Sequence, residues 1–210
     1  MIKTGGEKLQ EVDGLCFPTT AQAEELARDL SKRINGYGNS IDAALDVLVG
    51  ECIGLTNPVE EQIKRLLFQG TSVEKGNIHV VGSCRLGFSP ISKTKPDGTK
   101  LTAGRPFSLD SDIDIAIIDN DLYCAVWEDL FIEHPSLHAT NHGAKLSRYH
   151  LRGWLRPDLM PFKSTHRRIL RRLGNQLTKT TLRGRLSANV GLWKNEMFFL
   201  EYYKKSLEVI

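Results

Sequence analysis

The sequence lacks a long apolar segment, since no run of about 18 hydrophobic residues occurs within its 210 residues. A helix that crosses a bilayer needs such a run, so we expect no membrane span. The first residues, MIKTGGEKLQEVDG, also lack the apolar core of a secretory signal. We therefore expect a cytoplasmic protein.

Cysteine is scarce and widely spaced. None of the four cysteines belongs to a CxxC pair, which argues against a zinc knuckle and a dense disulfide framework. The sequence also has no P-loop, GxSxG or HExxH motif, so it gives no sign of the chemistries that these motifs support. With 40% hydrophobic and 25% charged residues, the composition is that of a folded protein. We expect a single domain over 1–210, with residues 1–17 loose.

Acidic residues are scarce late in the chain. Residues 139–210 hold 15 Lys and Arg but only four Asp and Glu, a net charge of +11, whereas residues 1–138 carry −8. The formal net charge of +3 is therefore a near-cancellation. The division predicts metal ions on the acidic part and phosphates on the basic part, or a simple attraction between two oppositely charged parts.

Apolar periodicity predicts helices at both ends of the chain and strands in the middle. We expect helices over about 19–34, 41–49, 57–68, 122–131, 165–177 and 190–203, strands over 78–81 and 111–118, and an irregular strand over 154–159. Within the first helix, Thr19 and Gln22 match a capping box. The histidines of 134–143 are expected on a loop.

The strand over 111–118 carries two carboxylates on one face. Because side chains alternate along a strand, Ile113, Ile115 and Ile117 face a core while Asp112 and Asp114 share the other face. Paired carboxylates repel each other, and a divalent cation such as Mg²⁺ or Mn²⁺ resolves the repulsion. The alternative is an edge strand whose carboxylates stay hydrated.

A Gly-Ser step follows the strand over 78–81. Gly82 lacks a Cβ, so its backbone can approach a phosphate closely, while Ser83 adds a hydroxyl and Arg85 a charge. The alternative is a plain turn out of the strand.

Together these residues resemble the DNA polymerase β-type nucleotidyltransferase superfamily. The resemblance covers about 78–118: Val81-Gly82-Ser83, then Leu86-Gly87, then Ser111-Asp112-Ile113-Asp114-Ile115. Within the superfamily, the Ser-Asp-Ile-Asp-Ile motif is similar to that of bacterial stand-alone and cGAS/DncV-like enzymes. It implies an α/β (α+β) fold with a small mixed sheet that carries the metal site, flanked by N- and C-terminal helices.

The resemblance also implies a mechanism. Asp112 and Asp114 would bind Mg²⁺ (or Mn²⁺) together with a nucleoside triphosphate such as ATP, and Gly82 and Ser83 would hold its β- and γ-phosphates. A nucleoside monophosphate would pass to an acceptor hydroxyl on RNA, a nucleotide or a protein, with release of pyrophosphate. A role in bacterial toxin or antiphage systems is implied by analogy alone.

Two features depart from the family's pattern. The 28 residues between Ser83 and Asp112 exceed the usual spacing, and we interpret 89–110 as an inserted loop or hairpin whose cations fold over a triphosphate or merely keep it solvated. The family's third carboxylate also has few candidates here. Asp158 is the best placed, as a third metal ligand and base, or else as a turn cap.

The basic part of the chain has two interpretations. Arg167, Arg168, Arg171 and Arg172 share a broad helix face that could bind phosphates or RNA, or could be simply solvated. The stripe of Trp193, Met197, Leu200 and Tyr203 is expected to pack in the core. If the third carboxylate is absent, the alternative function is a catalytically degenerate nucleotidyltransferase fold that binds nucleic acid or protein.

Overall fold

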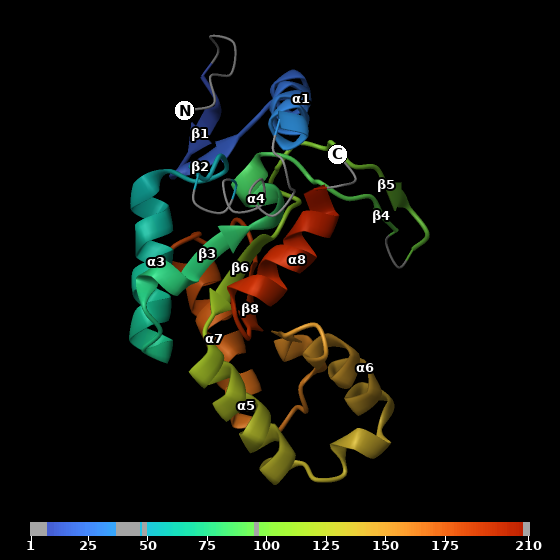
Figure 1. Cartoon of the computed structure of the whole chain (residues 1–210). Helices are drawn as coiled ribbons and strands as arrows, with labels where there is room; N and C mark the ends of the chain where they lie inside the picture. The colour runs from blue at the N-terminus through green and yellow to red at the C-terminus, as the bar shows by residue number, and fades with distance from the viewer. Residues whose placement is uncertain (1–7, 37–46, 48–49, 95–96, 208–210) are drawn as a thin grey trace. The chain divides into compact units, whose positions relative to one another are not determined.

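The computed structural model describes residues 8–36, 47, 50–94 and 97–207, and every statement below concerns that part of the chain (Figure 1). The predicted second helix falls almost wholly on 37–49 and so lies outside the described residues, apart from the buried Val47. No helix among the described residues is both long and apolar enough to span a membrane.

The described helices surround short strands in a mixed α+β arrangement. The helices are α1 (Thr20–Gly36), α3 (Asn57–Thr71), α4 (Gly82–Leu86), α5 (Asn120–Glu133), α6 (Asn141–His150), α7 (Thr165–Thr180) and α8 (Glu196–Leu207). Single 3₁₀ turns are η1 (Lys75–Asn77), η2 (Leu137–Ala139) and η3 (Pro157–Leu159). The strands are β1 (Gln10–Val12), β2 (Leu15–Phe17), β3 (Ile78–Val81), β4 (Lys93–Thr94), β5 (Lys100–Leu101), β6 (Ile113–Ile118), β7 (Trp154–Leu155) and β8 (Ala188–Trp193).

The main sheet has four strands in the order β3-β6-β8-β7. At its end β7 and β8 run antiparallel, with Trp154 opposite Trp193 and Leu155 opposite Leu192. Two separate antiparallel hairpins, β1-β2 and β4-β5, complete the described strands. The predicted small mixed sheet of an α+β fold is therefore confirmed.

The chain forms two compact units. The first unit comprises Met1–Gln62, Val80–Asp114 and Leu200–Ile210, and the second comprises Ile63–His79 and Ile115–Phe199. Each unit is assembled from segments that are distant in sequence, so no single linker divides the chain.

The first unit is organised around buried aromatic and aliphatic side chains. Phe88, Phe107 and Leu15 are almost completely buried, and the Phe107 ring stacks on Phe17 at 5.7 Å. At the start of α1, the Thr19 amide donates to Oε1 of Gln22 at 2.9 Å and the Gln22 amide donates to Oγ1 of Thr19 at 3.3 Å. The predicted capping box is therefore confirmed.

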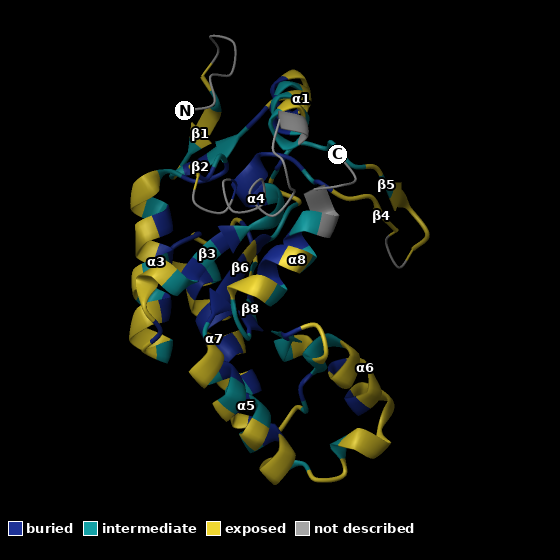
Figure 2. Ribbon diagram, viewed as in Figure 1, coloured by how far each residue is buried: buried dark blue, intermediate teal, exposed yellow. Residues whose placement is uncertain are grey.

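The second unit packs α7 against β8. Leu170, Leu173 and Leu177 form the buried side of the helix, and Val190 and Leu192 are buried on the strand. In Figure 2, α6 is largely exposed, whereas β6 is buried along most of its length. Polar α6 was not predicted, because its region shows no apolar period.

The predicted helix over 190–203 is wrong in its first half. Residues up to Trp193 form strand β8, and the helix begins only at Glu196. Between them, the side chain of Asn195 accepts a hydrogen bond from the Phe198 amide at 3.2 Å, which caps the new helix. Met197, predicted to pack in the core, is 61% exposed.

Candidate functional site

Strand β6 carries one exposed carboxylate in an otherwise buried run. Ile113, Ile115 and Ile117 are almost completely buried, as predicted, and the other-face residues Ala116 and Ile118 are buried as well. β6 is an interior strand of the sheet, with β3 and β8 as neighbours, so the edge-strand alternative is wrong. Asp114 is the one exposed residue of the strand. Asp114 is therefore exposed at one point of the strand, and the sheet face around it is not open to solvent.

Asp112 lies immediately before β6, which begins at Ile113 rather than at Ser111. It is half-buried and belongs, like Asp114, to the first unit. The two carboxylates are thus held two residues apart at the entry to a rigid, buried strand.

The Gly-Ser step lies directly against Asp114. Gly82 follows the last residue of β3 and begins α4 with a φ of +67°, in the left-handed region that favours glycine. A Cβ on Gly82 would lie 3.2 Å from Oδ2 of Asp114. The fold therefore brings the Gly82 backbone and the Asp114 carboxylate into direct proximity, with Ser83 half-exposed in the next position.

A tyrosine from the last helix joins this cluster. Tyr203 on α8 is 4% exposed, and its burial raises the pKa of the hydroxyl well above its usual range. The nearby Arg85 charge opposes that rise, while the Asp114 carboxylate adds to it. The phenol therefore stays protonated beside the Gly-Ser step. Sequence reasoning placed Tyr203 only in the core, and nothing in the sequence links it to residues more than 80 positions earlier.

Arg85 has an interior role in the structure. It is 4% exposed, and its guanidinium donates to the carbonyls of Val80 (2.9 Å) and Gly50 and to Oε1 of Glu60 (3.2 Å). These contacts anchor α4 to the rest of the first unit. A phosphate could reach this guanidinium only if they were broken, so the predicted nucleotide contact of Arg85 is left out of the proposal below.

Asp158 lies on a 3₁₀ turn in the second unit rather than on a strand. The predicted strand ends at Leu155, and η3 follows it. Both carboxylate oxygens accept hydrogen bonds from Arg156, at 3.0 and 2.9 Å, and the guanidinium also lies 5.0 Å from the Tyr149 ring centre. The structure gives Asp158 an arginine partner and does not place it on a strand of the sheet.

The strand beside β6 offers no replacement acid. The sequence of β8 is Ala188-Asn189-Val190-Gly191-Leu192-Trp193, with Asn189 exposed. Within the described ranges, no group of three or more His, Cys, Asp and Glu side chains could hold a metal ion. Among the described residues, the candidate Mg²⁺ ligands near the Gly-Ser step are Asp114, which lies against Gly82, and Asp112, two residues earlier in the sequence. They fit a hard cation, because Asp114 is exposed and a Cβ is missing beside it.

The predicted hairpin is present at 89–110. β4 and β5 pair with Lys93 opposite Leu101, and Lys93 and Lys100 are exposed. Arg105 is used at the base of the hairpin, where it donates to the Thr102 carbonyl at 2.7 Å and to the Ser89 hydroxyl at 3.3 Å. Lys95 lies outside the described residues.

Comparison with known proteins identifies no relative: no family model, no curated protein and no solved structure matches the chain. The resemblance to nucleotidyltransferases consequently rests on the motif residues and on the geometry around Gly82 and Asp114.

Proposed function

We propose that the protein is a metal-dependent nucleotidyltransferase whose site is formed by Gly82, Ser83, Asp112 and Asp114. The observation that carries the proposal is the close approach of Gly82 to Asp114. A Cβ added to Gly82 would lie 3.2 Å from Oδ2 of Asp114. Gly82 and Asp114 are 32 positions apart in sequence, yet they come together where phosphate and metal would have to meet.

Two residues of the site bind the metal and two contact the nucleotide. Asp112 and Asp114 supply the carboxylate oxygens for Mg²⁺ or Mn²⁺, and the Gly82 backbone and Ser83 hydroxyl contact the phosphates of the nucleotide. When bound, the metal neutralises phosphate charge and promotes in-line displacement at the α-phosphorus. The acceptor oxygen forms a bond to that phosphorus, the bond to the β-phosphate oxygen breaks, pyrophosphate leaves, and the acceptor's proton passes to solvent.

The test follows pyrophosphate release by the full chain. Each α-labelled nucleoside triphosphate is supplied with Mg²⁺ or Mn²⁺, with and without total RNA, and labelled products are separated. We expect release with at least one nucleotide, and a loss of about 100-fold or more in Asp112→Asn and Asp114→Asn. Asp110→Asn, which changes an exposed carboxylate two residues before Asp112, is the matched control and should retain full activity. Absence of pyrophosphate under every condition would contradict the proposal, as would equal release by Asp112→Asn.

A second candidate function is nucleotide binding without transfer. It is favoured by the Arg156 pair that holds Asp158 and by the absence of a carboxylate from the sequence of β8. Calorimetric titration with each nucleoside triphosphate and Mg²⁺ distinguishes the two. Binding that Asp114→Asn abolishes, without pyrophosphate release by the unaltered protein, would identify the degenerate fold.

A further inference from the structure

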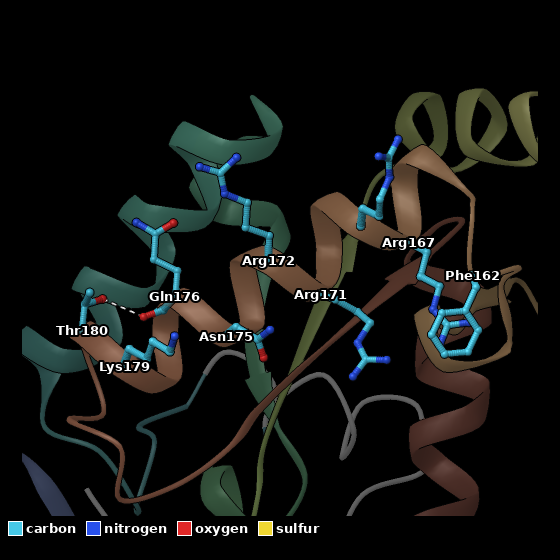
Figure 3. A pocket seen from close by; sticks show the side chains of 9 residues that line it. Phe162, Arg167, Arg171, Arg172, Asn175, Gln176, Lys179 and Thr180 are labelled. Carbon is cyan, nitrogen blue, oxygen red and sulfur yellow. Dashed lines mark hydrogen bonds between the residues drawn. The ribbon is translucent and has the colours of Figure 1, made fainter.

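Helix α7 carries a continuous cationic face in the second unit. Its 16 residues include no Asp or Glu, and its exposed side chains line a shallow hollow of about 690 Å³. We define the α7 strip as Arg168, Arg171, Arg172, Asn175, Gln176 and Lys179. Figure 3 shows Arg172 and Gln176 projecting to one side of the helix and Arg171 to the other, so the strip is broad rather than a single row.

No acidic side chain among the described residues neutralises the charges of the strip. Arg171, Arg172 and Lys179 form no ion pair with any other described residue, and Arg168 donates only to the Thr165 hydroxyl, at 3.4 Å. Arg85 and Arg156, in contrast, are each paired with a carboxylate. Exposed cations with no acid between them attract an anionic partner.

An exposed aromatic ring lies at the N-terminal end of the hollow. Phe162 is 81% exposed, although a phenyl ring gains from burial. The guanidinium of Arg167 lies 4.0 Å from the ring centre. Arg167 itself is 7% exposed and donates to the Met160 carbonyl, so it belongs to the interior rather than to the exposed arginine face, phosphate-binding or solvated, that the sequence predicts. The buried cation holds one face of the ring and leaves the ring presented to solvent (Figure 3).

Cations and amides beside an exposed ring match one class of partner. From Arg168 to Lys179 the helix rises about 16 Å, which is long enough for several phosphates of a stacked strand at about 3.4 Å each. Single-stranded binding sites combine a cationic groove with an aromatic side chain on which a base stacks. An acidic protein or a duplex would need the charges but not the ring.

We propose that the α7 strip binds the phosphate backbone of single-stranded nucleic acid and that Phe162 stacks on one of its bases. The residues involved belong to the second unit, so the proposal does not depend on the nucleotidyltransferase site. RNA and single-stranded DNA share this chemistry, and the probes below distinguish them.

The test measures fluorescence anisotropy of the full chain with labelled oligouridine and oligothymidine of about 20 nucleotides, and with a duplex RNA of equal length. We expect both single strands to bind more tightly than the duplex. Phe162→Ala should weaken binding about tenfold or more, whereas Phe162→Trp should retain it. The double variant Arg171→Gln, Arg172→Gln should weaken binding and lower the slope of log affinity against log salt by about 1.4.

The matched control is the double variant Arg148→Gln, Arg152→Gln, which removes the same charge from exposed positions of the second unit outside the strip. It should bind like the unaltered protein, as should Asp112→Asn, which separates this proposal from the nucleotidyltransferase one. Three results would overturn it: no measurable binding of either single strand, equal losses in the strip and control variants, or full affinity in Phe162→Ala. Tighter binding of the duplex would also overturn it.

Discussion

The guanidinium of Arg85 and the carboxylate of Glu60 form an ion pair 3.2 Å long, with both side chains at most 10% exposed. Arg85 belongs to the short helix that follows the Gly-Ser step, and Glu60 lies in the first turn of α3. The pair therefore fixes the backbone beside the proposed phosphate site from within the first unit. Arg85, which the sequence suggested as a phosphate contact, thus has interior partners that position the residues around it.

Removal of Glu60 should destabilise the protein strongly. Glu60→Ala leaves the Arg85 charge buried with carbonyl partners alone, and breaking one side of a buried pair costs about 3 kcal/mol or more. Chemical denaturation measures the free energy of unfolding. Glu61→Ala, at the exposed neighbouring position, is the control and should change it by about 0.5 kcal/mol or less. Equal effects of the two variants would show that the pair adds nothing to stability.

Helices with local signals could be predicted from the sequence. The capping box at Thr19 and the Asn57-Pro58 start each specify a helix within a few residues, and α1 and α3 begin as these signals indicate. Strand β6 was predicted because Ile113, Ile115 and Ile117 alternate with polar or small residues. Each of these signals lies within a few consecutive residues, so it can be recognised from the local sequence alone.

Strand β8 was missed for a physical reason. Val190, Trp193, Met197 and Leu200 recur at intervals that fit a helix, yet Val190 and Trp193 lie on the strand and Leu200 on α8. An apolar strand and the helix after it can reproduce a helical period by coincidence, and only pairing with β6 and β7 selects the strand. That pairing joins segments distant in sequence, which local periodicity does not encode.

The residues of the candidate site likewise differ in whether the sequence alone could point to them. Gly82, Ser83, Asp112 and Asp114 could be proposed from the sequence because the motif specifies residue types beside two strands, β3 and β6, which are neighbours in the sheet. The roles of Arg85 and Tyr203 could not, because they depend on Glu60 and α8, which the fold alone brings to these residues.

Glycine at position 174 should be required for the packing of α7 on β8. A Cβ there would lie 2.7 Å from the carbonyl oxygen of Ala188, a backbone atom that cannot rotate away. Gly174→Ala should therefore lower the free energy of unfolding by about 1–3 kcal/mol, although alanine is the better helix former. Thermal denaturation measures this change. Gly76→Ala, with no atom within 4 Å of the added Cβ, is the control and should have little effect on stability. A stabilised Gly174→Ala variant would contradict the close approach.

Acid should destabilise the second unit through His150. Its ring stacks on Trp127 at 3.7 Å, its Nδ1 lies 2.8 Å from the Tyr123 hydroxyl, and burial, helped by the charge of Lys194, lowers its pKa. Because the folded pKa lies below the unfolded value of about 6.5, the unfolded state binds more protons between the two. The stabilisation is complete above about pH 6.5 and is lost as the pH falls toward the folded pKa.

Denaturation at about pH 7.5 and pH 5.5 tests this expectation, with the pH range set by the reference pKa of histidine. His150→Phe keeps an aromatic ring but cannot titrate, so its loss of stability on acidification should be smaller than that of the unaltered protein. His142→Gln, which alters an exposed histidine of the same helix, should behave like the unaltered protein. If His150→Phe lost as much stability on acidification as the unaltered protein, that loss would have to come from other titratable groups.

Gly82 offers a way to separate backbone strain from loss of the site. Gly82→Ala should be strained, because an L side chain at a φ of +67° costs about 1 kcal/mol or more. It should also abolish pyrophosphate release, since the new methyl group would lie 3.2 Å from Oδ2 of Asp114 and displace the carboxylate. Gly184→Ala is the matched control, with a φ of +73° and no atom within 4 Å of its added Cβ. Thermal denaturation should show similar losses of stability in both variants, while only Gly82→Ala loses activity. Equal activity in the two would mean that contact between Gly82 and Asp114 plays no part in nucleotidyl transfer.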